Sequence, residues 1–306
     1  MKKKTNFNLV IVGGGSTYTP GIVKSLLDKK DQFKLEQLRL YDNNKERQDK
    51  VAVLVKKVVE MFDPELEVVV TTEPEEAFSD ADFIFAQMRV GLYKMRELDE
   101  KIPLKYGVVG QETCGPGGLA YGLRTIAPMV EIIDFCEKYA SREYWIVNYS
   151  NPAAIVAKAM HRLRPDARIL NICDMPVAIM RNMANILDCD RHDIVADYFG
   201  LNHFGWFTKI RVGEEDRTEE LKAYVKEHGY MPPDERSEVR HNDASWKHTF
   251  DNAKYLMRMF PDYLPNTYMQ YYLLSDQIVK DANKDYTRAN EVMDGREKRI
   301  FDTGDK

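Results

Sequence analysis

A short apolar segment that runs directly into consecutive glycines constrains the fold of this chain more than any other feature. Residues 7–12 are mostly apolar, and Gly13, Gly14 and Gly15 follow at once. Glycine permits the tight turn that joins a buried strand to a helix, and Pro20 suits the first turn of that helix. We therefore predict a strand at 7–12 and a helix at 20–30, with Thr19 as the N-cap of the helix.

The same alternation of short β-rich segments and amphipathic helices continues through the first two thirds of the chain. Such alternation builds βαβ units, so it predicts an α/β fold with a Rossmann-like, doubly wound parallel sheet. Further strands are expected at 38–41, 68–71, 83–87, 144–148 and 169–172, and helices at 44–62, 119–138 and 153–163.

The pattern changes near residue 197. Beyond it aromatic residues are dense, few strands can be recognised, and helices are expected at 218–227, 244–259 and 287–297. We predict two domains: a Rossmann-like domain over 1–197 and a mainly helical α+β domain over 198–306.

The glycine turn and the carboxylate that follows it favour a dinucleotide ligand. Free N–H groups at a helix N-terminus bind pyrophosphate, which makes Gly13, Gly14, Gly15, Ser16 and Thr17 candidate cofactor-binding residues.

Asp42 ends the second expected strand, near the position from which a dinucleotide fold directs a carboxylate at the adenosine ribose. A carboxylate there favours NAD over NADP. Each of the two signals is weak when taken alone. In the glycine turn, Tyr18 stands where the third glycine of G-x-G-x-x-G is expected, and Asp42 could simply cap the next helix.

Composition excludes several classes of protein. The net charge of −5 argues against a nucleic-acid partner. No apolar stretch has the length of a membrane span, and the apolar run after the basic N-terminus is too short for a signal peptide, so we expect a cytoplasmic location and no membrane partner. The four cysteines match neither a paired metal motif nor a disulfide framework.

Cys173 and His203 are candidate metal ligands. Cys173 follows an expected strand at the sheet edge where ligands bind, and His203 lies in the motif NHFGW. A thiolate and an imidazole suit a borderline transition metal and leave other coordination positions for substrate. Taken singly, a buried core cysteine and a structural histidine are the commoner alternatives.

Several long motifs in a fixed order carry a resemblance to a known family. They are GGGST at 13–17, GQETCGPGG at 110–118, NYSNP at 148–152, NICDMP at 171–176, NHFGW at 202–206, LPNTY at 264–268 and TRANE at 287–291. Together they resemble glycoside hydrolase family 4, the NAD-dependent group that departs from the two-carboxylate mechanism, and the resemblance runs essentially end to end.

The resemblance implies a mechanism of oxidation at C3 of the sugar, deprotonation at C2, elimination of the leaving group and addition of water. It implies that Cys173 and His203 bind a divalent ion, usually manganese, that Tyr268 is the base at C2, and that Asp174 protonates an α-linked leaving group. Alternatively, Tyr268 is a packed aromatic residue and Asp174 an N-cap.

The residue after the cysteine tracks substrate in the family. Asp174 resembles the 6-phospho-α-glucosidases, whereas phospho-β-glucosidases carry Asn there. The resemblance places Arg96, Asn151 and Arg288 at the 6-phosphate, since arginine binds phosphate through its fork of donors. Surface salt bridges, and for Asn151 a turn before proline, are the alternatives.

Three further residues have weaker assignments. Glu112 is expected near the metal or sugar without a definite role. His241 and His248 are interpreted as structural or surface residues.

The expected function is therefore NAD- and divalent-metal-dependent hydrolysis of 6-phospho-α-glucosides such as maltose 6′-phosphate. Residues 1–197 are then the NAD-binding domain and residues 198–306 the domain for substrate and metal. The alternatives are 6-phospho-β-glucosidase specificity, a hydroxy-acid dehydrogenase, and an inactive protein that binds NAD or sugar phosphate. The resemblance implies a homodimer or homotetramer for full-length members, which continue well past Arg296, so this chain is expected to be C-terminally shortened and its activity less certain than its family.

Overall fold

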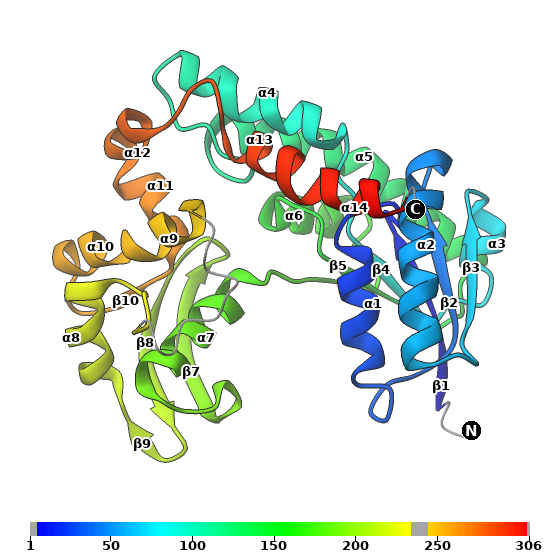
Figure 1. Ribbon diagram of the computed structural model, residues 1–306, viewed down its shortest axis with the longest axis horizontal. Coiled ribbons are helices and arrows are strands. Elements are labelled where there is room, and N and C mark those ends of the chain that lie inside the picture. Colours follow the sequence, from blue (N-terminus) through cyan, green and yellow to red (C-terminus); the bar gives the residue numbers. More distant parts are fainter. Residues whose placement is uncertain (1–4, 234–243, 305–306) are drawn as a thin grey trace. The chain divides into compact units, whose positions relative to one another are not determined.

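The computed structural model describes residues 5–233 and 244–304, which form two compact units (Figure 1). The first unit comprises residues 1–102, 111–172 and 284–306, and the second comprises 103–110 and 173–283. Each unit is built from segments that are not consecutive in the sequence. The domain boundary expected between residues 197 and 198 stays a prediction.

The first unit contains the predicted parallel sheet. Its strands are β1 (Asn6–Val12), β2 (Lys34–Tyr41), β3 (Glu67–Thr71), β4 (Phe83–Ala86), β5 (Trp145–Asn148) and β6 (Ile169–Asn171). They lie in the order β3-β2-β1-β4-β5-β6, and every neighbouring pair is parallel. This is the strand order of dinucleotide-binding folds, in which ligands bind where the order reverses, beside β1 and β4. The fold prediction is confirmed.

Helices connect and cover these strands (Figure 1). They are α1 (Thr19–Leu27), α2 (Lys45–Phe62), α3 (Pro74–Phe78), α4 (Leu92–Lys105), α5 (Gly115–Tyr139) and α6 (Ala153–Leu163), and the last segment adds α13 (Arg288–Val292), a π-helical turn η5 (Met293–Glu297) and α14 (Lys298–Gly304). The predicted helix at 287–297 is therefore α-helical only to Val292, and the π turn forms the rest of that range. Thr19 is not an N-cap as predicted: Tyr18 occupies that position, and the buried Thr19 hydroxyl accepts a hydrogen bond from Gln87 Nε2 at 2.8 Å.

Alternate residues of β1 build a core on each face of the sheet. Val10 and Val12 pack in a cluster with residues of α3, α5 and α6, while Leu9 and Ile11 pack with residues of α1 and α2. A strand that is buried on both faces has a nearly continuous apolar sequence, which is why apolar and polar residues do not alternate over 7–12. Burial of each such side chain contributes about 1.5–3 kcal/mol.

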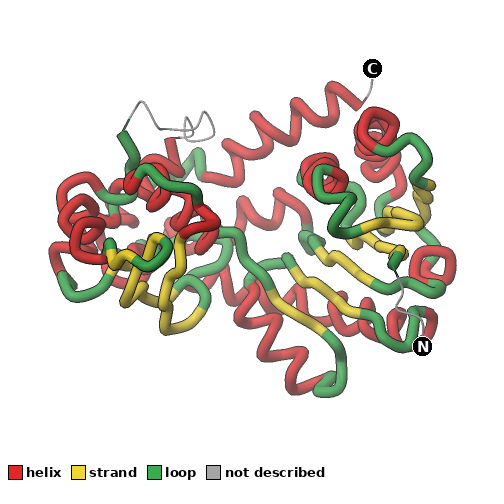
Figure 2. The backbone as a smooth tube through the Cα atoms, turned by 90° about the horizontal axis from the view of Figure 1, so that it is seen from below, coloured by secondary structure: helices red, strands yellow, loops and turns green. Residues whose placement is uncertain are grey.

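The second unit combines helices with an antiparallel sheet (Figure 2). Its strands are β7 (Ile194–Leu201), β8 (Phe204–Val212), β9 (Glu215–Asp216) and β10 (Leu264–Pro265), and its helices are α7 (Met175–Leu187), α8 (Thr218–His228), α9 (Ala244–Asp251), α10 (Ala253–Met259), α11 (Gln270–Leu273) and α12 (Ser275–Asp281), with short 3-10 turns at η1 (Arg191–Asp193) and η4 (Thr267–Met269). The expected α+β character is confirmed.

The β7–β8 hairpin is an element that the sequence analysis did not identify. Its aromatic residues have high β propensity, and they lie on paired strands rather than in helices. The predicted helix at 244–259 is also two helices, which meet at Asn252, whose amide donates to Gln270 Oε1 at 2.7 Å.

Across the described residues, none of the helices combines the length and apolar character needed to cross a membrane.

Candidate active site

The glycine turn after β1 has the tight geometry that its sequence predicts. The N–H groups of Gly13 and Gly14 both donate to the Tyr41 carbonyl at 2.9 Å, and Ser16 N–H donates to Gly13 O at 2.9 Å. Gly13 has φ +81°, and a Cβ atom there would lie 3.1 Å from the Cα of Met88. Only glycine meets both demands without strain.

Asp42 and Thr17 complete this turn. Asp42 Oδ2 accepts from Gly15 N–H at 2.9 Å, and its Oδ1 accepts from the N–H of Asn44, which itself caps α2. The Thr17 hydroxyl is buried and has no hydrogen-bond partner within the described part of the chain. A glycine cradle, a carboxylate at the end of β2 and an orphaned buried hydroxyl together fit a dinucleotide at the α1 N-terminus.

In the second unit, Cys173 and His203 meet although 30 residues separate them. Cys173 Sγ lies 3.3 Å from His203 Nε2. An ion held at the bond lengths of zinc sites, about 2.1 Å to nitrogen and 2.3 Å to sulfur, spaces those atoms about 3.1 Å apart at a right angle and about 3.6 Å at a tetrahedral angle. The pair therefore fits a shared divalent ion. Among residues 5–233 and 244–304, no three or more His, Cys, Asp or Glu are arranged so that they could together hold a metal ion, so the metal assignment rests on these two side chains.

His203 is held by the β7–β8 hairpin. Leu201 pairs with Phe204, so Asn202 and His203 form the turn, and His203 has φ +67° with 6% of its surface exposed. Histidine is among the few residues that enter the left-handed region with some frequency, and a strained residue held by its surroundings often marks a functional site.

Tyr268 stacks on the His203 ring. The ring centroids are 4.0 Å apart and the planes differ by 19°. The fully buried Asn266 caps the short η4 turn by accepting from Tyr268 N–H at 3.0 Å, which fixes the backbone of the tyrosine. The structure thus brings together Cys173, His203 and Tyr268, three residues assigned separately from sequence.

Asp174 is exposed at the start of α7. It occupies the N-cap position, but its side chain makes no capping hydrogen bond, so the alternative of a purely capping role is not realised in this geometry.

In the first unit, Arg96 belongs to a buried ion-pair network. Its Nε donates to Glu100 Oε1 at 2.7 Å, and its Nη1 lies 3.1 Å from Glu112 Oε2, which also pairs with Arg89 Nη1 at 2.8 Å. Burial lowers the pKa of the Arg96 guanidinium, but the Glu112 and Glu100 carboxylates outweigh it, so the pKa lies above its ordinary value. The alternative of a surface salt bridge at Arg96 is therefore wrong, because the network is buried.

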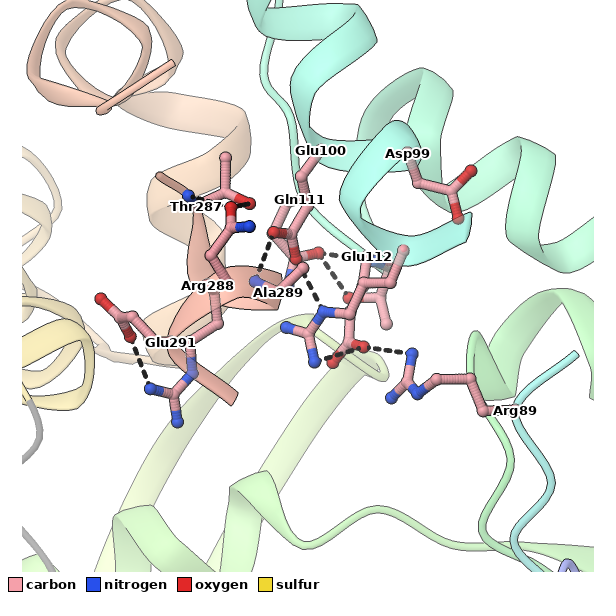
Figure 3. A network of polar contacts seen from close by, with 12 residues as sticks. Arg89, Asp99, Glu100, Gln111, Glu112, Thr287, Arg288, Ala289 and Glu291 are labelled. Carbon is pink, nitrogen blue, oxygen red and sulfur yellow. Dashed lines mark hydrogen bonds and ion pairs between the residues drawn. The ribbon is translucent and has the colours of Figure 1, made fainter. Parts of the chain in front are cut away.

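Glu100 connects α4 to α13, the helix that carries Arg288 (Figure 3). While its Oε1 accepts from Arg96, its Oε2 accepts from Ala289 N–H at 2.8 Å. Arg288 pairs with Glu291 at 2.6 Å and is 28% exposed. One buried carboxylate thus brings two of the predicted phosphate ligands, Arg96 and Arg288, into one network.

The arginines of this network are already neutralised by carboxylates. An added anion that bound one of them would have to displace its carboxylate. The Arg288–Glu291 pair is the more exposed, and such i,i+3 surface pairs are worth only about 0–1 kcal/mol. Displacing Glu291 from Arg288 would accordingly cost least.

The remaining assigned residues make other contacts. Asn151 follows β5, and its carbonyl accepts from Thr125 Oγ1 at 3.4 Å. His248 lies in α9, where its ring contacts Asn252 at 3.1 Å, in keeping with a structural role. His241 lies outside the described residues.

Sequence reasoning missed Arg89 and Glu100. Arg89 follows β4, at the edge of the sheet where ligands bind, and its guanidinium lies over the Tyr93 and Tyr121 rings at 5.1 and 5.2 Å. Glu100 stands four residues after Arg96, a spacing that places both on one helix face and could have revealed the pair.

Two family models match almost the whole chain. "Family 4 glycosyl hydrolase" matches residues 8–189, and "Family 4 glycosyl hydrolase C-terminal domain" matches residues 198–306.

Individual proteins are also similar. The maltose-6′-phosphate glucosidase MalH of Clostridium acetobutylicum is 55% identical over 98% of this chain and 67% of its own length. A 6-phospho-α-glucosidase from gut microorganisms, solved with NAD and glucose-6-phosphate, superposes with a TM-score of 0.96 at 57% identity, over 98% of this chain and 68% of that one. A second, solved with NAD and Mn²⁺, gives 0.93 at 48% identity, over 98% and 69%.

The chain spans about two thirds of the length of the curated relatives that it matches. Both family models and a relative that is more than half identical agree, and the chain therefore belongs to family 4 of the glycosyl hydrolases.

Proposed function

We propose that this chain catalyses NAD- and divalent-metal-dependent hydrolysis of 6-phospho-α-glucosides. The observation that carries the proposal is the Cys173–His203 pair at 3.3 Å with Tyr268 stacked on the histidine. Relatives that are named maltose-6′-phosphate glucosidase or solved with NAD, Mn²⁺ and glucose-6-phosphate support it.

The residues divide the work by chemistry. When bound, NAD supplies reversible oxidation of the sugar at C3 and a divalent ion polarises the oxygen on that carbon. Residues 13–17 and Asp42 would hold NAD, and Cys173 and His203 would hold the ion.

Tyr268 removes the proton from C2 in this proposal. A carbonyl at C3 acidifies that proton, but a free phenol has a pKa of about 10 and is a weak base at neutral pH. The stack on His203 places the phenol ring next to a side chain that would carry a divalent cation, and a nearby cation favours the phenolate. Tyr268 is therefore better suited to this role than an isolated tyrosine.

Asp174 donates a proton to the leaving oxygen. Its exposed carboxyl makes no capping bond, so it can meet a substrate. This assignment favours α-linked over β-linked substrates, and 6-phospho-β-glucosidase specificity is the alternative.

Arg96, Asn151 and Arg288 are the proposed ligands of the 6-phosphate. Arg288 exchanges Glu291 for phosphate, while the network around Glu100 keeps Arg96 in place. A homodimeric or homotetrameric assembly and a cytoplasmic location also remain predictions.

One assay tests the proposal. The protein is incubated with a chromogenic α-glucoside 6-phosphate, NAD⁺, Mn²⁺ and a thiol reductant, in parallel with the β-anomer and the unphosphorylated α-glucoside. We expect chromophore release from the phosphorylated α-anomer alone, without net NADH. Stoichiometric NADH would indicate a dehydrogenase, preference for the β-anomer would indicate the other specificity, and binding without release would indicate an inactive binder.

A further inference from the structure

The C-terminal segment of the first unit lies against the glycine turn. Helix α14 packs on α2, and Glu297 of the π turn forms an ion pair with Arg47 at the start of α2 (Figure 1). Arg47 Nε in turn donates to the Gly15 carbonyl at 2.9 Å. A single arginine therefore links the C-terminal segment to the turn.

Arg296 is the residue of this segment that faces the α1 N-terminus. Its guanidinium carbon lies 3.9 Å from the centroid of the Tyr18 ring. Tyr18 is the N-cap residue of α1 and stands where the third glycine of a G-x-G-x-x-G motif is expected. The ring also meets Tyr149 after β5 edge-on, with centroids 6.5 Å apart, and so holds the guanidinium beside the edge of the sheet where ligands bind.

The charge of Arg296 is not matched by a carboxylate in the described part of the chain, and its buried Nε has no hydrogen-bond partner there. The other arginines around this end of the unit do have such partners: Arg47 pairs with Glu297, Arg96 with Glu100 and Glu112, and Arg288 with Glu291. A buried guanidinium donor without an acceptor is costly, and an anion is the acceptor that removes that cost.

The π turn contains Arg296 and follows α13, which begins at Arg288, on one continuous helical run. Met293–Glu297 adopts π-helical backbone, and α14 follows without a break. Single π turns are frequent at functional sites. This one carries Arg296 and Glu297, which contact Tyr18 and Arg47 beside the glycine turn.

We infer that Arg296 binds the pyrophosphate of the dinucleotide. The inference rests on the proposed use of NAD. The glycine turn and the α1 N-terminus supply backbone N–H donors to one side of the pyrophosphate, and Arg296 supplies a planar fork of charged donors. The Tyr18 ring holds the guanidinium by stacking and cation–π attraction, which leaves its N–H groups for phosphate oxygens. Tyr18, at the position where the third glycine is expected, thus holds a cation in place.

The test measures binding and needs no turnover. The Kd for NAD and for ADP-ribose is measured by calorimetry for the wild type, Arg296→Ala, Arg296→Lys and Arg299→Ala. Arg299 is exposed on α14 and is the matched control. Loss of a charge-assisted hydrogen bond predicts a Kd roughly tenfold or more higher for both ligands in Arg296→Ala, a smaller rise in Arg296→Lys, and no change in Arg299→Ala. Adenosine, which lacks the pyrophosphate, should bind all four proteins equally.

Other results would overturn the inference. An unchanged Kd for NAD in a folded Arg296→Ala protein would leave Arg296 only a packing role. A weakened Kd for glucose 6-phosphate with NAD affinity intact would assign the residue to the sugar phosphate instead. If Arg296→Ala unfolds, Arg296→Lys still tests the inference. A wild-type Kd for NAD in Arg296→Lys would show that the guanidinium fork of Arg296 does not bind the pyrophosphate. A wild-type chain that binds no NAD would overturn both the proposed cofactor and this inference.

Discussion

Replacing Glu100 with glutamine should cost far more stability than the same change at a neighbouring glutamate. Glu100 is 2% exposed, and its two oxygens accept from two different donors, Arg96 Nε at 2.7 Å and Ala289 N–H at 2.8 Å. Glutamine keeps one acceptor oxygen, but its amide group then faces one of those donors. The variant therefore loses one charge-assisted hydrogen bond and leaves Arg96 with less compensating charge.

The magnitude follows from the burial of the pair. Removing one partner of a buried ion pair costs about 3–5 kcal/mol, a large part of the 5–15 kcal/mol that stabilises a typical domain. Glu97 lies one turn earlier on α4 and is 29% exposed. It contacts Lys101 on the same helix and Asn290 on α13, the helix that also carries Ala289. Glu97→Gln is thus a matched control that should cost less than about 1 kcal/mol.

Urea denaturation followed by circular dichroism measures both effects. We expect a clearly lower midpoint for Glu100→Gln and a midpoint near that of the wild type for Glu97→Gln. If turnover is measurable, Glu100→Gln should also raise KM for the phosphorylated sugar more than it lowers kcat, because it loosens Arg96. Equal midpoints for the two variants would refute the bridging role assigned to Glu100.

Three further predictions address the site. Cys173→Ser should weaken manganese binding and abolish hydrolysis, because serine is a poor ligand for a borderline metal at neutral pH; full activity with unchanged manganese dependence would contradict the pairing with His203. Arg288→Ala should raise KM for the phosphorylated substrate about tenfold or more, since a hydrogen bond to a charged group is worth about 1.5–3 kcal/mol, and an unaltered KM would place the phosphate elsewhere. Gly13→Ala should lower stability by about 1–3 kcal/mol and weaken NAD binding, because φ is +81° and the new Cβ would approach Met88; calorimetry and thermal melting check both, and an unperturbed variant would show that the turn is not strained.

The parallel sheet could be predicted because its signals are local. The apolar run 7–12, the glycines after it and the regular return of amphipathic helices each fix a short piece of chain. Side chains that pack on both faces of β1 then require the continuous apolar pattern that the sequence displays. The resemblance to a family supplied the roles of Cys173, His203 and Tyr268, and the fold explains how they meet.

What could not be predicted depends on contacts between distant residues. No local pattern in 284–306 indicates that this segment packs in the first unit, where Glu297 pairs with Arg47 and Ala289 bonds Glu100. The β7–β8 hairpin was missed because its aromatic residues lack clear alternation, and its turn uses Asn202 and His203 rather than glycine. These placements are decided by tertiary packing, which outweighs local propensity.

Isotope exchange at C2 tests the central claim most directly. If Tyr268 removes the C2 proton, turnover of a 6-phospho-α-glucoside in D₂O should place deuterium at C2 of the released glucose 6-phosphate. Tyr268→Phe should lose both exchange and hydrolysis while it still binds NAD and manganese, because Asn266 and the His203 stack do not require the phenol oxygen. Hydrolysis by a carboxylate pair leaves that C–H bond intact. Glucose 6-phosphate that carries only protium at C2 after full turnover in D₂O would contradict the account.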